Sequence, residues 1–301
     1  MRAVENALGI TIPDNARILR NLLEGAQFVQ DHVIHFYHLH ALDWVDIVSA
    51  LSADPAATST LARSISDWPN SSPEHFQGVR DRLQAFVDSG QLGLFANAYW
   101  SHPEYKLPPE GNLLAVAHYL EALDWQREII KIHALLGGKN PHPQTYLVGG
   151  MAIPVDPARP EAINPQRIDQ LRSLASQALE FVAKVYLPDL MLVASFYPEW
   201  AELGEGVGHY LAYGDFPADT SGDPAALWLP QGLVFGKALG APPVPLDHTR
   251  IGEYVTHSWY NYAGGDGVAK HPWNGETEWR YTGPQPPFEF LDTNGKYSWL
   301  K

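Results

Sequence analysis

The architecture of this chain is indicated first by residues 16–51, ARILRNLLEGAQFVQDHVIHFYHLHALDWVDIVSAL. No proline interrupts this stretch, and only Gly25 breaks its helical pattern. A continuous helix of this length would be roughly 50 Å long at 1.5 Å per residue. Its apolar residues spread over more than one face, so we expect the helix to be buried on several sides; they are Leu22, Val29, Val33, Phe36, Leu39, Leu42, Trp44 and Ile47.

Start and stop signals predict further helices before residue 198. Asn164-Pro165 is one such start, because asparagine caps a helix and proline fits its first turn. Gly137-Gly138 is one such stop, since glycine readily adopts the backbone conformation that ends a helix. The expected helices cover about residues 1–8, 73–87, 112–136 and 165–186.

The composition changes near residue 198, after which glycine, proline, tryptophan and tyrosine crowd the sequence. Turn signals there predict short strands, including Leu227–Leu229 and Gly232–Phe235, joined by long loops. We therefore expect a mainly α protein that forms a single domain with a minor α+β part. A long-helix bundle would occupy residues 1–197, and a loop-rich segment with short strands would occupy residues 198–301.

Composition narrows the function classes. Thirty-four acidic residues against twenty Lys and Arg give a net charge of −14, so we expect no nucleic-acid partner. Charged residues are only 18% of the chain, which predicts that a partner covers part of its surface. Residues 1–20 lack the apolar core of a signal peptide, and no apolar run is long enough to span a membrane. The absence of cysteine excludes disulfides, thiolate metal sites and Cys nucleophiles within these 301 residues.

A helix rich in histidine is the first candidate site. Residues 31–47, DHVIHFYHLHALDWVDI, contain four histidines and three aspartates. His35 and His38 are three residues apart and share a helix face, so a metal site is one interpretation. A second is a set of buried side chains that hydrogen-bond to each other, and a third is the surroundings of a cofactor held elsewhere. The Glu-x-x-His repeats of dinuclear carboxylate bundles are missing.

A second candidate lies in LLGGKNPHPQTYLVGG, residues 135–150, where His142 sits between two prolines after the end of a helix. Such a histidine is held in place, which favours a role in proton transfer or hydrogen bonding, although a simple capped turn explains the residues equally well. HSWYNY (257–262), HPWNGET (271–277) and KYSWLK (296–301) are aromatic clusters that we expect to pack against a neighbour rather than to catalyse.

These segments together resemble the large subunit of nickel–iron hydrogenase, and most closely the respiratory, membrane-associated uptake type. RAVENALGI near the start, DHVIHFYHLHALDW, GGKNPHPQTYLVGG and the three aromatic clusters agree in order along essentially the whole chain. The resemblance implies reversible oxidation of H2 at a nickel–iron centre with CO and cyanide ligands. It also implies a small-subunit partner that carries iron–sulfur clusters, and a place in the cell envelope at the periplasmic face of the membrane.

The resemblance also implies roles for three residues. Asp31 matches a carboxylate in the canopy over the metals, where it would pair with a catalytic arginine outside this sequence. Leu39 matches an apolar residue that lines the gas channel, and His142 matches the loop histidine that approaches the small subunit's proximal cluster. The family binds its metals through two cysteine-pair motifs, R-x-C-G-x-C and D-P-C-x-x-C-x-x-H, and neither occurs here.

We therefore expect a central fragment that contributes no metal ligand. Alone it should bind no nickel, show no hydrogenase activity, and aggregate or require a partner. Two alternatives remain at this point. One is a metal-free structural or quinone-side relative with the same fold, and the other is a His/Asp metalloprotein that uses the helix at residues 31–47.

Overall fold

The computed structural model describes residues 1–95, 104–204, 206–251, 260–261, 278–279 and 298–299. It contains two compact units, Met1–Leu203 and Gly204–Lys301. Most of the three aromatic clusters at 257–262, 271–277 and 296–301 lies outside the described residues. No helix in the described part is long and apolar enough to cross a bilayer.

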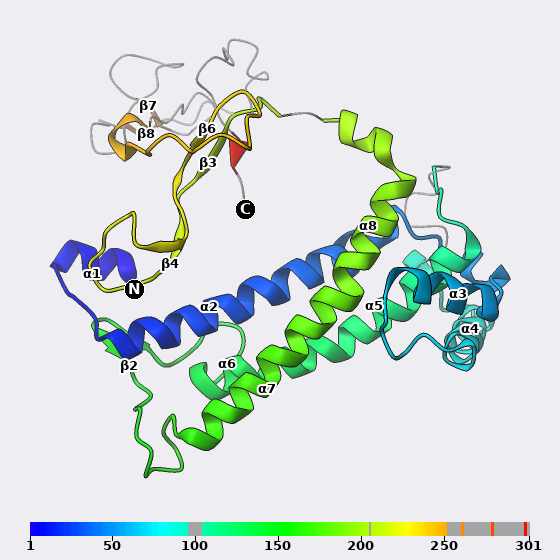
Figure 1. Ribbon diagram of the computed structural model, residues 1–301, viewed down its shortest axis with the longest axis horizontal. Helices are drawn as coiled ribbons and strands as arrows, with labels where there is room; N and C mark the ends of the chain where they lie inside the picture. Colours follow the sequence, from blue (N-terminus) through cyan, green and yellow to red (C-terminus); the bar gives the residue numbers. More distant parts are fainter. Residues whose placement is uncertain (96–103, 205, 252–259, 262–277, 280–297, 300–301) are drawn as a thin grey trace. The chain divides into compact units, whose positions relative to one another are not determined.

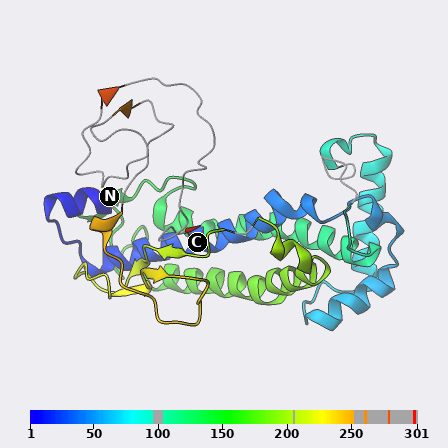
Figure 2. The ribbon, with the colours of Figure 1, turned by 90° about the horizontal axis from the view of Figure 1, so that it is seen from above.

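The first unit is built from helices, which Figure 1 and Figure 2 show from two directions. Of its three longest helices, α2, α5 and α7, the helix α5 packs against both of the others. Its α-helices are α1 (Arg2–Leu8), α2 (Asp14–Ile34), α3 (Pro55–Ile65), α4 (Pro73–Asp88), α5 (Pro109–Ile129), α6 (Lys131–Gly137), α7 (Pro165–Phe181) and α8 (Leu187–Phe196). Two π-helical segments, η1 (His35–His40) and η5 (Val182–Tyr186), continue α2 and join α7 to α8. Short 3₁₀ turns are η2 (Ala41–Asp43), η3 (Ser49–Ser52), η4 (Gly93–Phe95) and η6 (Pro198–Glu202), and a small hairpin pairs β1 (Tyr146–Leu147) with β2 (Gly150–Met151).

The predicted starts and stops of several helices are confirmed by their caps. Ser72 accepts a hydrogen bond from the backbone N–H of His75, and Asn164 accepts one from Arg167. Gly138 ends α6 with a φ of 79°, a left-handed conformation that costs glycine little. These signals are local, so each could be recognised without knowledge of the packing.

The single helix expected over residues 16–51 is wrong in its second half. The regular α-helix ends at Ile34, and η1 and η2 carry the chain only to Asp43. Beyond that point Asp46 accepts hydrogen bonds from the backbone N–H groups of Val48 and Ser49, while its own N–H donates to the Asn112 side chain. These side-chain bonds satisfy the backbone in a turn and compete with further helix.

The expected burial of this helix on several sides is also wrong within this chain. One face of α2 and η1 packs into the core through residues that are less than 9% exposed: Leu19, Leu23, Ala26, Val33, Phe36 and Tyr37. Outside this buried face Leu22 is 46% exposed and Leu39 is 63% exposed. The helix therefore buries a single stripe against α5, α6 and the segments that follow it.

The second unit consists of short strands and loops. A three-stranded sheet has the order β6 (Gly232–Val234), β3 (Tyr210–Ala212), β9 (Ser298–Trp299), in which β3 pairs antiparallel with β6 and parallel with β9. Two further pairs join β4 (Asp215–Pro217) to β5 (Leu227–Leu229) and β7 (Tyr260–Asn261) to β8 (Glu278–Trp279), and a 3₁₀ turn, η7, covers His248–Arg250. The predicted mainly α fold with a short-strand appendix is confirmed, including the strands near 227–229 and 232–235.

Candidate functional site

An exposed stripe on α2 and η1 is the candidate site, and we call it the open face. Its members are all exposed and lie three, four or six residues apart along the helix. It comprises Ile18, Leu22, Phe28, Asp31, His35 and Leu39. Apolar side chains dominate it, although a helix face that remains in water is normally polar. The open face is therefore suited to being covered.

Asp31 and Leu39, two of the three predicted site residues, lie on this open face. The Asp31 carboxylate accepts a 2.6 Å hydrogen bond from Gln27 Nε2, one helical turn earlier. That bond orients the carboxylate, and Asp31 remains exposed. Leu39 projects from η1 with 63% of its surface exposed. An exposed apolar side chain in this position can form one wall of an apolar channel, provided that other segments form the remaining walls.

The histidines of η1 do not form the predicted His35–His38 pair. His35 Nε2 lies 3.2 Å from His40 Nε2, and His40 Nδ1 lies 3.1 Å from Asp43 Oδ2. His38 turns instead toward α5, where Gln126 Nε2 is 2.7 Å from its Nδ1. Burial lowers the pKa of His38, which favours its neutral form. The π-helical winding of this segment accounts for the difference, because it changes which residues share a face.

His142, the third predicted site residue, lies on the loop after α6. It is exposed and has a φ of 59°. The loop is fastened at both ends, since Gln144 N–H donates to the Gly137 carbonyl and Asn140 Nδ2 lies 2.6 Å from His133 Nδ1. Buried His133 in turn contacts the Leu23 carbonyl of α2 through its Nε2, at 2.9 Å. The predicted positioned loop histidine thus lies on a different element from Asp31 and Leu39.

Gly137 should be sensitive to any added side chain, because it packs directly under this loop. A Cβ at this position would lie 2.8 Å from the Cβ of Pro143 and 3.3 Å from Leu23 Cδ2. We expect Gly137→Ala to cost about 1–3 kcal/mol of unfolding free energy through overpacking. Gly78→Ala is the matched control, since nothing lies within 4 Å of its Cβ position. Equal denaturation midpoints for the two variants would contradict the close packing.

A buried ion pair was not foreseen from the sequence. Arg20 donates to both carboxylate oxygens of Glu5 at 2.7 and 2.8 Å, and both residues are less than 5% exposed. Arg20 also donates to the carbonyls of Leu147 and Gly150 at 2.8 and 2.9 Å, and Gly149 N–H donates to Glu5. The hydrogen bond from Arg20 is the main cause that lowers the pKa of Glu5 to about 2. The pair joins α1, α2 and the β1–β2 hairpin.

A buried trio of polar side chains was also not foreseen from the sequence. Tyr37 Oη donates to Asp189 Oδ2 at 2.7 Å, and His118 Nδ1 lies 2.8 Å from the same oxygen. All three residues are 2–3% exposed. Burial is the main cause that raises the pKa of Tyr37 well above its ordinary value, so its hydroxyl stays protonated. Burial opposes a charge on His118, but the Asp189 carboxylate outweighs it and raises the pKa of His118.

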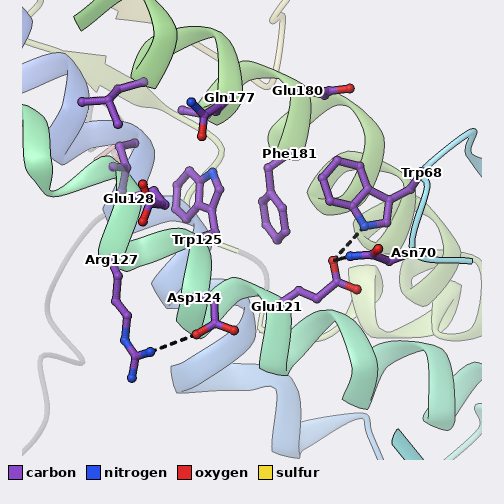
Figure 3. Close-up of a pocket in the computed structure, with 13 residues that line it drawn as sticks. Trp68, Asn70, Glu121, Asp124, Trp125, Arg127, Glu128, Gln177, Glu180 and Phe181 are labelled. Atoms are coloured by element: carbon purple, nitrogen blue, oxygen red, sulfur yellow. Dashed lines mark hydrogen bonds and ion pairs between the residues drawn. The ribbon is translucent and has the colours of Figure 1, made fainter. Parts of the chain in front are cut away.

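A cleft of about 500 Å³ opens between α5 and α7 (Figure 3). Trp125 stacks on Phe181 with ring centroids 5.2 Å apart, and Glu121 accepts hydrogen bonds from Trp68 Nε1 and Asn70 Nδ2. Glu128 and Glu180 line it as well, with Arg127 paired to Asp124 at its edge. None of the predicted site residues lines this cleft.

Comparison with known proteins places these features in a family. The sequence pattern of the nickel-dependent hydrogenases matches residues 1–301. The chain belongs to this family. It is 53% identical to the uptake hydrogenase large subunit of Rhizobium leguminosarum bv. viciae over 100% of the chain, and 44% identical to the hydrogenase-1 large chain of Escherichia coli K12 over 99%. In both cases it covers 52% of the relative, so the chain spans about half their length.

Solved structures of nickel-dependent hydrogenases share the fold. The reduced, active Ni-Fe-Se hydrogenase of Desulfomicrobium baculatum aligns with a TM-score of 0.61 at 25% identity, over 92% of this chain and 46% of that one. The as-isolated oxidised Ni-Fe-Se hydrogenase of D. vulgaris Hildenborough aligns with a TM-score of 0.60 at 25% identity, over 90% and 44%. Membership of the family thus agrees with both the sequence and the helical architecture.

The residues of this chain do not by themselves fit the nickel–iron centre of this family. Thiolates and imidazoles are the protein ligands suited to such ions, and the 301 residues contain no cysteine. In the part of the chain that the structure describes, no group of three or more His, Asp or Glu side chains could hold a metal ion. His35 and His40 lie close together, but in the described part of the chain no third side chain completes a metal site with them. We therefore assign no metal ligand and derive no reaction step at the metal.

Proposed function

We propose that this chain is the scaffold portion of a hydrogenase large subunit of the respiratory uptake type, which oxidises H2 to protons and electrons. The observation that carries the proposal is the family match over residues 1–301, together with uptake hydrogenase large subunits at 53% and 52% identity. The open face supports it, because its exposed apolar residues require cover from the rest of such a subunit or from its partner.

Each site residue has chemistry that suits its proposed role. The Asp31 carboxylate is exposed beside Gln27 and is free on one side to accept from an arginine in the canopy over the metals. The Leu39 side chain offers an apolar wall to H2. His142, on its fastened loop, contributes a ring nitrogen at the interface with a small subunit that carries iron–sulfur clusters.

We propose a cofactor, a partner and a location as well. A nickel–iron centre with CO and cyanide ligands would be held by residues other than those of this chain. The residues of this chain would contribute the surroundings of that centre. The small subunit would receive the electrons through its clusters. The assembly would act in the cell envelope, at the periplasmic face of the membrane.

The test uses the polypeptide that carries these 301 residues as cells produce it, purified with its bound partners. We expect stoichiometric nickel and H2-dependent reduction of a redox dye. Leu39→Trp should raise the KM for H2 at least about fivefold, with a smaller change in kcat, because it narrows the route to the metals without altering them. Leu22→Trp, on the same open face but outside the proposed channel, should leave the KM within about twofold.

Two results would contradict the proposal, the first as a whole and the second only in the role of Leu39. Nickel-free polypeptide that reduces no dye under H2 would favour a metal-free structural or quinone-side relative with the same fold. An active enzyme in which Leu39→Trp leaves the KM for H2 unchanged would remove Leu39 from the gas channel while leaving the hydrogenase assignment intact.

A further inference from the structure

Two π-helical segments contact each other inside the first unit. η1 (His35–His40) continues α2, and η5 (Val182–Tyr186) joins α7 to α8. The ring of Phe36 meets that of Tyr186 edge-on at 5.4 Å, and Tyr37 lies 6.4 Å from Tyr186. π-Helical turns are rare and are less favourable than α-helix, so their persistence here requires contacts that hold them.

The buried trio lies at this meeting point. Tyr37 belongs to η1, Asp189 follows η5 by three residues, and His118 comes from α5. A single oxygen, Asp189 Oδ2, accepts a hydrogen bond from Tyr37 Oη and lies 2.8 Å from His118 Nδ1. Because three helices share one acceptor, a shift of any one of them breaks a buried hydrogen bond, and a buried polar group without its partner is costly.

This anchoring has a direct effect on the exposed side of η1. Tyr37 is 2% exposed and faces the core, whereas Leu39, two residues later, is 63% exposed. A π-turn contains more residues than an α-turn, so it rotates every later side chain around the helix axis. If the segment were regular α-helix, Leu39 and His40 would point in other directions.

The geometry points to Tyr37, Asp189 and His118 as positioning residues that hold η1 in its π-helical form and thereby set the direction of Leu39. The inference rests on the proposed function, which places Leu39 in the channel for H2. It goes beyond that function because it makes the direction of the Leu39 side chain depend on a hydrogen-bonded trio on the opposite side of the helix.

Tyr37→Phe tests the inference, since it removes one hydroxyl and keeps the ring. In the purified native complex, we expect the variant's structure by electron cryo-microscopy to show residues 35–40 rewound toward α-helix. We expect the KM for H2 to change at least about threefold while kcat stays within about twofold. Tyr186→Phe is the matched control, because Tyr186 lies in the same aromatic cluster outside the trio, and it should change neither.

The outcomes separate the inference from the proposed function. An unchanged π-helical segment in Tyr37→Phe overturns the positioning role, whether or not the complex oxidises H2. A rewound segment with an unchanged KM overturns the link to the channel. A wild-type complex without H2 oxidation refutes the proposed function, and the structural comparison still decides the positioning role. If Tyr37→Phe does not accumulate, Asp189→Asn replaces it: the same two measurements should show residues 35–40 displaced from the π-helical form and a changed KM for H2, and an unchanged segment overturns the positioning role.

Discussion

Arg20→Leu is expected to lower the free energy of unfolding of the chain by about 3–5 kcal/mol, because it leaves the Glu5 carboxylate buried without its partner. The substitution also removes the donor to the carbonyls of Leu147 and Gly150, which weakens the attachment of the β1–β2 hairpin to α2. Pulse proteolysis across a urea series measures the loss on small amounts of protein.

The pH dependence of the free energy of unfolding provides an internal control for this result. In the wild type the pKa of Glu5 is lowered from 4.5 to about 2, so the ion pair contributes fully above pH 4.5 and is lost as the pH falls toward 2. In Arg20→Leu protonation of Glu5 relieves the unpaired charge, so the difference between the two proteins should shrink between pH 7 and pH 4. Arg127→Leu, at an ion pair that is 78% exposed, should cost about 1 kcal/mol or less. Similar losses at Arg20 and Arg127 would contradict the buried pair.

Asp189→Ala is the second substitution with a large expected effect. It removes the shared acceptor of Tyr37 and His118 and leaves both polar groups buried, at an expected cost of about 3–5 kcal/mol. The same urea measurement applies. Asp189→Asn should lose less than Asp189→Ala, because its amide oxygen still accepts from the Tyr37 hydroxyl.

The control for this second prediction is Asp169→Ala. Asp169 pairs with Arg172 on the surface of α7, where both side chains are about three-quarters exposed, so we expect a loss of about 1 kcal/mol or less. A stability of Asp189→Ala equal to that of Asp169→Ala would show that the trio contributes nothing to the bundle.

Local signals made much of the fold predictable. Asn164-Pro165 and Gly138 act on their immediate neighbours, so helix boundaries followed from them. The buried contacts were not predictable in this way, because Tyr37 and Asp189 are 152 residues apart and periodicity carries no information on such pairs. The turn after Asp43 was missed because the bond from Asp46 N–H to Asn112 depends on the packing of α5.

The site was predictable only through resemblance. Asp31, Leu39 and His142 were named because their segments match a family, and their roles remain predictions. From the residues alone, Leu39 was expected to be buried, since apolar periodicity does not reveal which polypeptide covers a helix face. Leu39 is 63% exposed in the described part of the chain, which its apolar character alone could not have indicated.

The contacts of Arg20 impose an order on events at the ribosome. Its partner Glu5 is made 15 residues earlier, so α1 and α2 can meet as soon as both have emerged. The Leu147 carbonyl is 127 residues further along, which at about 5–20 residues per second is a delay of about 6–25 s. Throughout that interval the Arg20 guanidinium group has only part of its final set of acceptors. The nascent amino-terminal helices lack their contact with the hairpin until it has been translated.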